Sequence, residues 1–372
     1  MTLKERLLAV MEHRQPDVMP WFSDLTYWYG AAASSGTLPE RWQGEGVVDL
    51  YRDLNTGCHE HALNSPWKAE YEDVETSTET ETDSGGTPTR QKTEWRTPVG
   101  TLTQIKSYEP VAYAWAYRQY PVRTPEDLKV LRFLREHQHV TPDCTRQEHQ
   151  LRLWGDVGVC ASVPPRNPMA DLIVIWMGVM NAVYALADTP EEIERTLDVM
   201  GAADDPIYEI IANSPAPLVY FPDNITGEVV SPTIFKRYYA PYYKRRVPAL
   251  HDAGKYIFLH IDGTMRSVLP LVGETGIDAA QSLTPAPVGD VAVSEMGGLA
   301  GPDVIVWGGV PAAFFSPVYP ESVLRDIVME CIRCFPRSEN FILGVCDQVP
   351  PDGVIERVKM VSDLVEEHAR YE

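Results

Sequence analysis

Positive charge is scarce in this chain. Its 372 residues include 32 Lys and Arg against 53 Asp and Glu, which gives a formal net charge of −21. Because such a surface repels phosphate backbones and anionic lipid, the composition argues against nucleic acid and membrane surfaces as partners. The longest apolar run, near 172–180, is too short to span a bilayer, and residues 1–17 carry charges where a signal peptide is apolar. We therefore expect a soluble protein of the cytoplasm.

Cysteine is sparse as well. Six cysteines in so long a chain do not make a disulfide framework, and reduced thiols are free to bind metal. Cys331 and Cys334 form a Cys-x-x-Cys pair late in an amphipathic helix pattern, but no second pair exists to complete a metal site. Gly308 and Gly309 lack the spacing of a dinucleotide or phosphate loop. Neither motif is therefore interpreted as a functional site.

Strand-type and helix-type segments alternate along most of the chain. Apolar strands with connections too short for hairpins indicate a parallel sheet covered by helices. Close to eight strand-helix units are present, which predicts an α/β fold with a single (β/α)8 TIM-type barrel over residues 1–372; a doubly wound sheet is the alternative. Between about 31 and 120 the composition changes, and alternating Glu and Thr around the turn at 84–86 predict a β-rich insertion.

Two predicted strands end in side chains that can bind metal. Residues 255–263 (KYIFLHIDG) lead into His260 and Asp262, which point the same way because they are two apart on a strand. Residues 341–346 (FILGVC) end in Cys346. His and Cys at the ends of different strands can converge on zinc, which takes N, S and O ligands tetrahedrally. The alternative is a small core cysteine and a histidine bonded to a backbone carbonyl.

Other polar and aromatic side chains follow further predicted strands. They are Asp24, Tyr27, Trp28 and Tyr29 after a strand at 18–22, and Asp223, Asn224 and Glu228 after a strand at 217–221. In a barrel these positions lie at the C-terminal face, where active sites are found. The aromatic residues also suit a cover over the end of the core, and Glu228 also suits a position ahead of a helix start.

Four stretches resemble the uroporphyrinogen decarboxylase superfamily, and within it the cobalamin-dependent methyltransferases more than the decarboxylases. They are TLKERLLAVMEHRQPDVMPW, AGKYIFLHIDG, WGGVPA and ILGVCDQVPPDGVIERVKMV. The resemblance implies one (β/α)8 barrel with a funnel at the strand C-termini. The decarboxylases hold substrate carboxylates with an arginine-rich segment after the first strand. Residues 21–26 contain no Arg, so porphyrinogen decarboxylation is not expected.

The resemblance also implies a metal site. The family's methyltransferases bind zinc through a His-x-Cys pair at one strand end and a Cys near the C-terminus. His260 matches the His, Cys346 matches the late Cys, and Asp262 stands in place of the first Cys. Glu228 is a rival or additional ligand, because zinc accepts carboxylate oxygen. Replacing a thiolate by a carboxylate makes zinc harder and more Lewis acidic, which suits a methyl group linked through oxygen.

We therefore expect a zinc-dependent methyltransferase that moves a methyl group between a small O-methyl compound and the cobalt of a corrinoid. The corrinoid, methylcobalamin, is expected on a partner protein, because the sequence has no DxHxxG-type cobalamin loop. The candidate roles are proton transfer by Glu228 and Asp24, substrate orientation by Asp223 and Asn224, and an aryl pocket formed by Tyr27 and Trp28.

Two other functions stay open. A cofactor-free decarboxylase of a non-porphyrin acid predicts no bound metal and an Arg or Lys in the funnel. A non-catalytic binding barrel would explain the missing first Cys. Related barrels often pair, so a homodimer is a further possibility.

Overall fold

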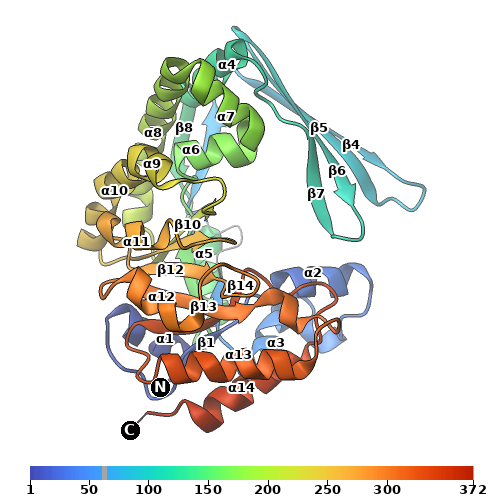
Figure 1. Ribbon diagram of the computed structural model, residues 1–372. Coiled ribbons are helices and arrows are strands. Elements are labelled where there is room, and N and C mark those ends of the chain that lie inside the picture. The colour runs from blue at the N-terminus through green and yellow to red at the C-terminus, as the bar shows by residue number, and fades with distance from the viewer. Residues whose placement is uncertain (61–64, 372) are drawn as a thin grey trace. The chain divides into compact units, whose positions relative to one another are not determined.

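Eight parallel strands form the central barrel of the computed structural model, which describes residues 1–60 and 65–371. Their order around the sheet is β1 (Trp21–Phe22), β14 (Phe341–Cys346), β13 (Ile305–Pro311), β12 (Ala279–Leu283), β11 (Tyr256–Ile261), β10 (Leu218–Ile225), β9 (Gly158–Ser162) and β2 (Cys58–Glu60). A parallel bridge between Phe22 and Gly57 joins the two outer strands, β1 and β2. The predicted α/β barrel is thus confirmed (Figure 1).

Helices alternate with the barrel strands and cover them. They include α2 (Thr26–Ser34), α3 (Val47–Leu54), α5 (Thr145–Trp154), α9 (Pro232–Ile234), α10 (Ala240–Asp252), α11 (Leu269–Val272), α12 (Val293–Ala300), α13 (Glu321–Cys334) and α14 (Glu356–His368). Helix α5 packs on β9, α10 on β11, and both α12 and α13 on β13. The strands between them are mostly apolar and buried, as is typical of parallel strands covered on both faces.

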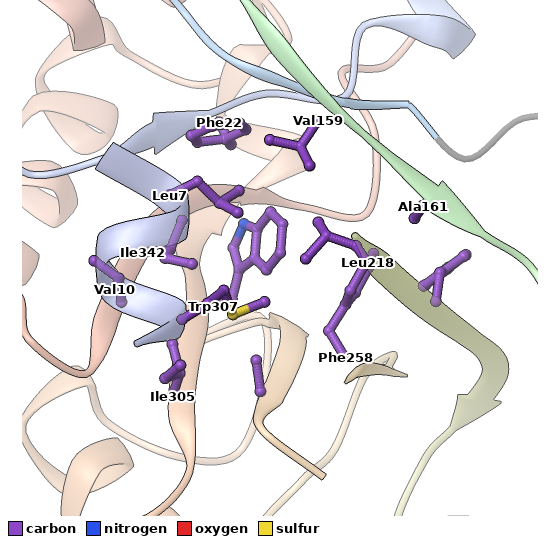
Figure 2. Packing of buried hydrophobic residues seen from close by; sticks show 13 residues of the cluster. Leu7, Val10, Phe22, Val159, Ala161, Leu218, Phe258, Ile305, Trp307 and Ile342 are labelled. Atoms are coloured by element: carbon purple, nitrogen blue, oxygen red, sulfur yellow. The ribbon is translucent and has the colours of Figure 1, made fainter. Parts of the chain in front are cut away.

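The barrel interior is filled by large side chains rather than by a channel. Figure 2 shows the Trp307 indole in the middle of this cluster. The indole lies edge-on to Phe22 at 5.9 Å and against Phe258 at 5.0 Å between ring centroids. A Cβ on Gly344 would come within 2.9 Å of the same indole, so only glycine fits opposite it. The cluster also contains Leu7 and other residues of α1 (Leu3–Met11).

Helix α1 begins with a capping box. The Thr2 hydroxyl accepts a hydrogen bond from the Glu5 backbone N–H, and the Glu5 carboxylate accepts one from the Thr2 N–H. The loop after α1 is held by Asp17, whose carboxylate accepts hydrogen bonds from Arg6 Nε at 2.8 Å and Nη2 at 3.2 Å. These contacts fix where the chain turns from α1 into β1.

Asp17 gives the fold a predictable response to acid. Partial burial by itself raises the pKa of Asp17, but hydrogen bonds from Arg6 and the N-terminal amine outweigh burial and lower it from 3.8 to about 2. A carboxyl whose pKa is lower in the folded state than in the unfolded chain stabilises the fold at pH values above its unfolded-state pKa. That stabilisation is lost as the pH falls toward 2. Asp17→Asn should therefore be less stable than the parent at pH 5. The difference between their urea midpoints should shrink to near zero at pH 2, and a constant difference would contradict the assignment.

Residues 67–143 and 165–210 form a second compact unit. Its antiparallel strands are β3 (Trp67–Tyr71) paired with β8 (Gln138–Pro142), and a meander of β4 (Glu75–Thr82), β5 (Pro88–Thr97), β6 (Gly100–Glu109) and β7 (Ala114–Gln119) (Figure 1). Its helices are α4 (Pro125–Glu136), α6 (Pro168–Asp171), α7 (Val179–Asp188) and most of α8 (Pro190–Ala212). The Asp83 carboxylate accepts hydrogen bonds from the Gly85 and Thr87 N–H groups and shapes the predicted turn between β4 and β5.

The β-rich segment begins later than the predicted boundary of about residue 31. Residues 31–60 contain helices and the barrel strand β2, so the antiparallel strands start only at Trp67. Strand β2 was not predicted, because the sequence Cys58-His59-Glu60 has no strand pattern of its own. His59 of this strand is buried: it is 5% exposed, with its ring centroid 4.9 Å from that of Trp307. His61 lies outside the described residues.

In the described part of the chain, no helix combines the length and apolar character needed to cross a membrane.

Candidate functional site

His260 lies inside the C-terminal end of β11 and is 5% exposed. Its Nδ1 is 2.6 Å from Oε1 of Gln281, the residue paired with it on β12. Because an amide oxygen only accepts hydrogen bonds, Nδ1 carries a proton and donates it to Gln281. The Tyr220 ring stands perpendicular to the imidazole, with centroids 5.9 Å apart. The site thus holds the imidazole in one orientation.

Cys346 ends β14 and is 2% exposed. Its Sγ donates a hydrogen bond to the Leu283 carbonyl of β12 at 3.1 Å. Burial raises the pKa of Cys346 to about 12, although hydrogen bonds from the Thr284 hydroxyl and the Gly309 and Val310 N–H groups act in the opposite direction. The sulfur is therefore a neutral thiol in this structure. The hydrogen-bond donors around it would favour a thiolate if a bound cation balanced the negative charge of the sulfur.

Strand β12 connects these two side chains. Its Gln281 contacts His260, and its Leu283 contacts Cys346. Between them lies Ser282, where the pairing with β13 shifts register and the backbone has a φ of +70°. The Ser282 hydroxyl accepts a hydrogen bond from the Asp347 N–H at 2.7 Å. A bulge with left-handed backbone is costly for serine, and such features concentrate at functional sites.

The loops after β1 and β14 meet at Asp24, which is 6% exposed. Gln348 donates hydrogen bonds to Asp24 Oδ2 at 3.3 Å and to Thr26 Oγ1 at 2.7 Å. The Asp24 carboxylate also accepts from the Thr26 N–H at 2.9 Å and from the Thr26 hydroxyl. Gln348 is two residues from Cys346, so Asp24 is held at the same face of the barrel.

Asp262 and Glu228 lie on two loops that are bonded to each other. The Asp262 N–H donates to the Ile225 carbonyl at 2.8 Å, and the Gly227 N–H donates to the Thr264 carbonyl at 2.7 Å. Both carboxylates are exposed, so they lie at the rim and not with the buried His260. Their position leaves both available to a bound ligand.

The four predicted substrate-binding residues differ in their exposure to solvent: one is buried, one is exposed and two are half-buried. Asp223 is 2% exposed and accepts a hydrogen bond from the Tyr243 hydroxyl of α10, which places its carboxylate against a covering helix. Asn224 is exposed, with a φ of +49°. Tyr27 and Trp28 are half-buried on α2, and the Trp28 Nε1 donates to the Gly353 carbonyl at 3.0 Å.

The donor chemistry at His260 and Cys346 fits a zinc ion, but a complete ligand set is not assembled. In residues 1–60 and 65–371, no three His, Cys, Asp or Glu side chains are grouped so that they could hold a metal ion. His260 presents Nε2 with its Nδ1 proton held by an amide oxygen, as metal-bound histidines do. Cys346 supplies sulfur among hydrogen-bond donors. A third protein ligand would have to come from the rim.

The sequence reasoning missed three residues of this region: Gln281, Ser282 and Gln348. A signal existed for Gln281, because it is the one amide in the short strand Ala279–Leu283 and a buried polar side chain needs a partner. Ser282 carried no comparable signal, since its role depends on a register shift between strands.

Comparison with known proteins places the chain in a family. The family model for uroporphyrinogen decarboxylase (URO-D) matches residues 165–368. This chain therefore belongs to the URO-D family.

Among solved structures, a methyltransferase from Methanosarcina mazei shares the fold, with a TM-score of 0.60, 14% identity and 99% of each chain covered. A ribulose-1,5-bisphosphate carboxylase/oxygenase from Pyrococcus horikoshii OT3 matches with a TM-score of only 0.30 and 12% identity over 66% of this chain and 48% of its own. No curated protein matches this chain. At 14% identity, the likeness to the first structure shows a shared fold.

Proposed function

We propose that this protein is a methyltransferase that moves a methyl group between a small O-methyl compound and the cobalt of a corrinoid bound to a partner protein. The observation that carries the proposal is a pair of buried groups that are both hydrogen-bonded to β12: the His260 imidazole of β11 and the Cys346 thiol of β14. Membership of the URO-D family and a fold shared with a methyltransferase support it. The absence of Arg from residues 21–26 argues against decarboxylation of a porphyrinogen.

We further propose that His260 and Cys346 hold zinc, with Asp262 or Glu228 as the third protein ligand. Zinc at such a site supplies Lewis acidity toward an oxygen atom of the substrate. Gln281 holds the Nδ1 proton of His260, so Nε2 is the atom that would bind the metal. The polar groups around Cys346 lower the cost of ionising its sulfur.

The remaining residues of the site handle the substrate and its proton. Asp24, held by Thr26 and Gln348, is positioned to orient a substrate hydroxyl or to exchange a proton with the departing oxygen. Glu228 has the same chemical capacity from the rim. Demethylation would break the C–O bond of the donor and transfer the methyl group to the Co(I) form of the corrinoid, and the oxygen would leave as an alkoxide or phenolate that takes up one proton from Asp24 or Glu228.

The test uses purified protein, cob(I)alamin as the methyl acceptor and anisole as the methyl donor. Formation of methylcobalamin is followed by its visible absorbance, and zinc is measured in protein purified without added metal. The proposal predicts enzyme-dependent methylation of cobalt and about one zinc per chain. Absence of zinc together with decarboxylation of small carboxylic acids would favour the alternative decarboxylase function.

Gln281 is expected to act through His260 and not on the substrate. Gln281→Leu removes the acceptor for the Nδ1 proton, so zinc affinity and methyl transfer should each fall about 10- to 100-fold. Gln281→Glu keeps an acceptor oxygen and should recover most of the zinc affinity. Competition with a chelator of known affinity measures the effect. Equal zinc affinity in Gln281→Leu and the parent would show that the hydrogen bond has no such role.

A further inference from the structure

Two residues near the ends of β12 and β14 have left-handed backbone and are bonded to each other. Ser282 has a φ of +70° and Asp347 has a φ of +67°. The Asp347 N–H donates to the Ser282 hydroxyl oxygen at 2.7 Å, and Ser282 is 0% exposed. Left-handed backbone is unfavourable for residues that carry a Cβ, and it persists where surrounding contacts enforce it. At this pair, two segments of the chain therefore constrain each other.

Strands β12 and β14 are not neighbours in the sheet, because β13 lies between them. They meet where the pairing of β12 with β13 shifts register, between Gln281 and Leu283. Gly308 of β13 permits this approach, since a Cβ there would lie 2.6 Å from the Leu283 backbone nitrogen and 2.7 Å from its carbonyl oxygen. Gly308, which fits no phosphate loop, thus leaves room for the bulge of β12.

The bulge holds two consecutive residues at the end of β14. The Leu283 carbonyl accepts a hydrogen bond from Cys346 Sγ at 3.1 Å, and the Ser282 hydroxyl accepts one from the next backbone N–H, that of Asp347. The first contact needs the thiol proton, which a metal-bound cysteine no longer has. The second contact involves only a main-chain N–H. It can therefore hold the backbone beside Cys346 with or without a bound metal.

We propose that Ser282 is a positioning residue of the metal site. Its hydroxyl, through the Asp347 N–H, fixes the end of β14 and keeps the Cys346 sulfur where it can bind a metal together with His260. Ser282 is fully buried, so it acts through Cys346 and not on the substrate. This role rests on the proposed function, because it assigns Ser282 a task in the proposed zinc site.

Cobalt(II) bound in place of zinc tests this role, because a thiolate ligand gives Co²⁺ an intense charge-transfer absorbance in the near ultraviolet. The part of this band that is lost in Cys346→Ser reports ligation by Cys346. Ser282→Ala should lose most of that part and bind Co²⁺ about tenfold more weakly. Ser282→Gly should lose as much of the band. Its urea midpoint should be the higher of the two, because glycine adopts a φ of +70° freely.

Ser338→Ala is the matched control. Ser338 is also a buried serine with left-handed backbone, with 3% exposure and a φ of +52°. Its hydroxyl donates to the Phe341 carbonyl at 2.6 Å, at the end of β14 that lies away from Cys346. Its loss should lower the urea midpoint and leave the cobalt band unchanged.

Urea titration shows that each variant is folded before its cobalt spectrum is compared. A parent-like band in folded Ser282→Ala or Ser282→Gly would overturn the role of the hydroxyl. Loss of the band in folded Ser338→Ala would overturn it as well, since the band would then follow stability alone. A parent protein without a band that depends on Cys346 would instead overturn the proposed metal site, and the role of Ser282 with it.

Discussion

Replacing His260 by alanine is expected to lower the rate of methyl transfer about a thousandfold, which corresponds to about 4 kcal/mol in activation free energy. The imidazole is the only nitrogen donor among the proposed zinc ligands, and its orientation is fixed by the 2.6 Å contact with Gln281. Its loss should remove most of the bound zinc as well as the activity. The measurements are the rate of methylcobalamin formation and the zinc content of the same preparation.

The matched control for this variant is His251→Ala. His251 lies on α10 and is exposed, with its Nε2 3.0 Å from Asp278, so its removal changes a surface ion pair in the same unit. This control should keep parent activity and zinc. If His260→Ala folds, retains zinc and transfers methyl groups within about threefold of the parent, the proposed role of His260 is wrong.

Replacing Trp307 by alanine is expected to destabilise the barrel by about 3–5 kcal/mol. The indole is 1% exposed and packs against Phe22, Phe258 and the backbone at Gly344. Truncation leaves a cavity in the centre of the interior cluster shown in Figure 2. The neighbouring side chains are held in place by the barrel strands, so they cannot move to fill this cavity. The free energy of unfolding is measured by urea titration.

Trp42→Ala serves as the control, because that indole is half-buried outside the barrel and donates a hydrogen bond to Asp53 at 2.8 Å. Its loss should cost about 1 kcal/mol, the usual scale for one hydrogen bond. Similar losses for the two variants would contradict the view that the barrel interior is close-packed around Trp307.

The barrel could be predicted because its strands carry their own signal. Strands such as Phe341–Cys346 are continuous apolar runs followed by helix starts, and their alternation places His260 and Cys346 at strand ends before any coordinates are known. Strand β2 could not be found in this way. It forms because Gly57 lets the Phe22 ring approach to a distance that a Cβ would block, and because Gly158 does the same for the Cys58 backbone. Both contacts join residues far apart in the sequence.

The candidate site was predictable only in part, for a related reason. In the sequence, Asp223 follows what looks like a regular strand. The pairing of β10 with β11 shifts between Phe221 and Ile225, so the alternation of side chains along the strand does not decide whether Asp223 faces the barrel interior or the covering helices. The structure places its carboxylate on Tyr243 of α10. Likewise, the link between His260 and Cys346 runs through Gln281 and Leu283 of a third strand, which no spacing rule identifies.

The most direct test of the central claim is X-ray absorption at the zinc edge on the purified protein. Zinc shared by His260 and Cys346 predicts about one zinc per chain, a sulfur neighbour near 2.3 Å and nitrogen or oxygen neighbours near 2.0–2.1 Å, with the sulfur shell lost in Cys346→Ser. Protein that contains no zinc, or zinc whose neighbours are the same in the parent and in Cys346→Ser, would contradict the claim.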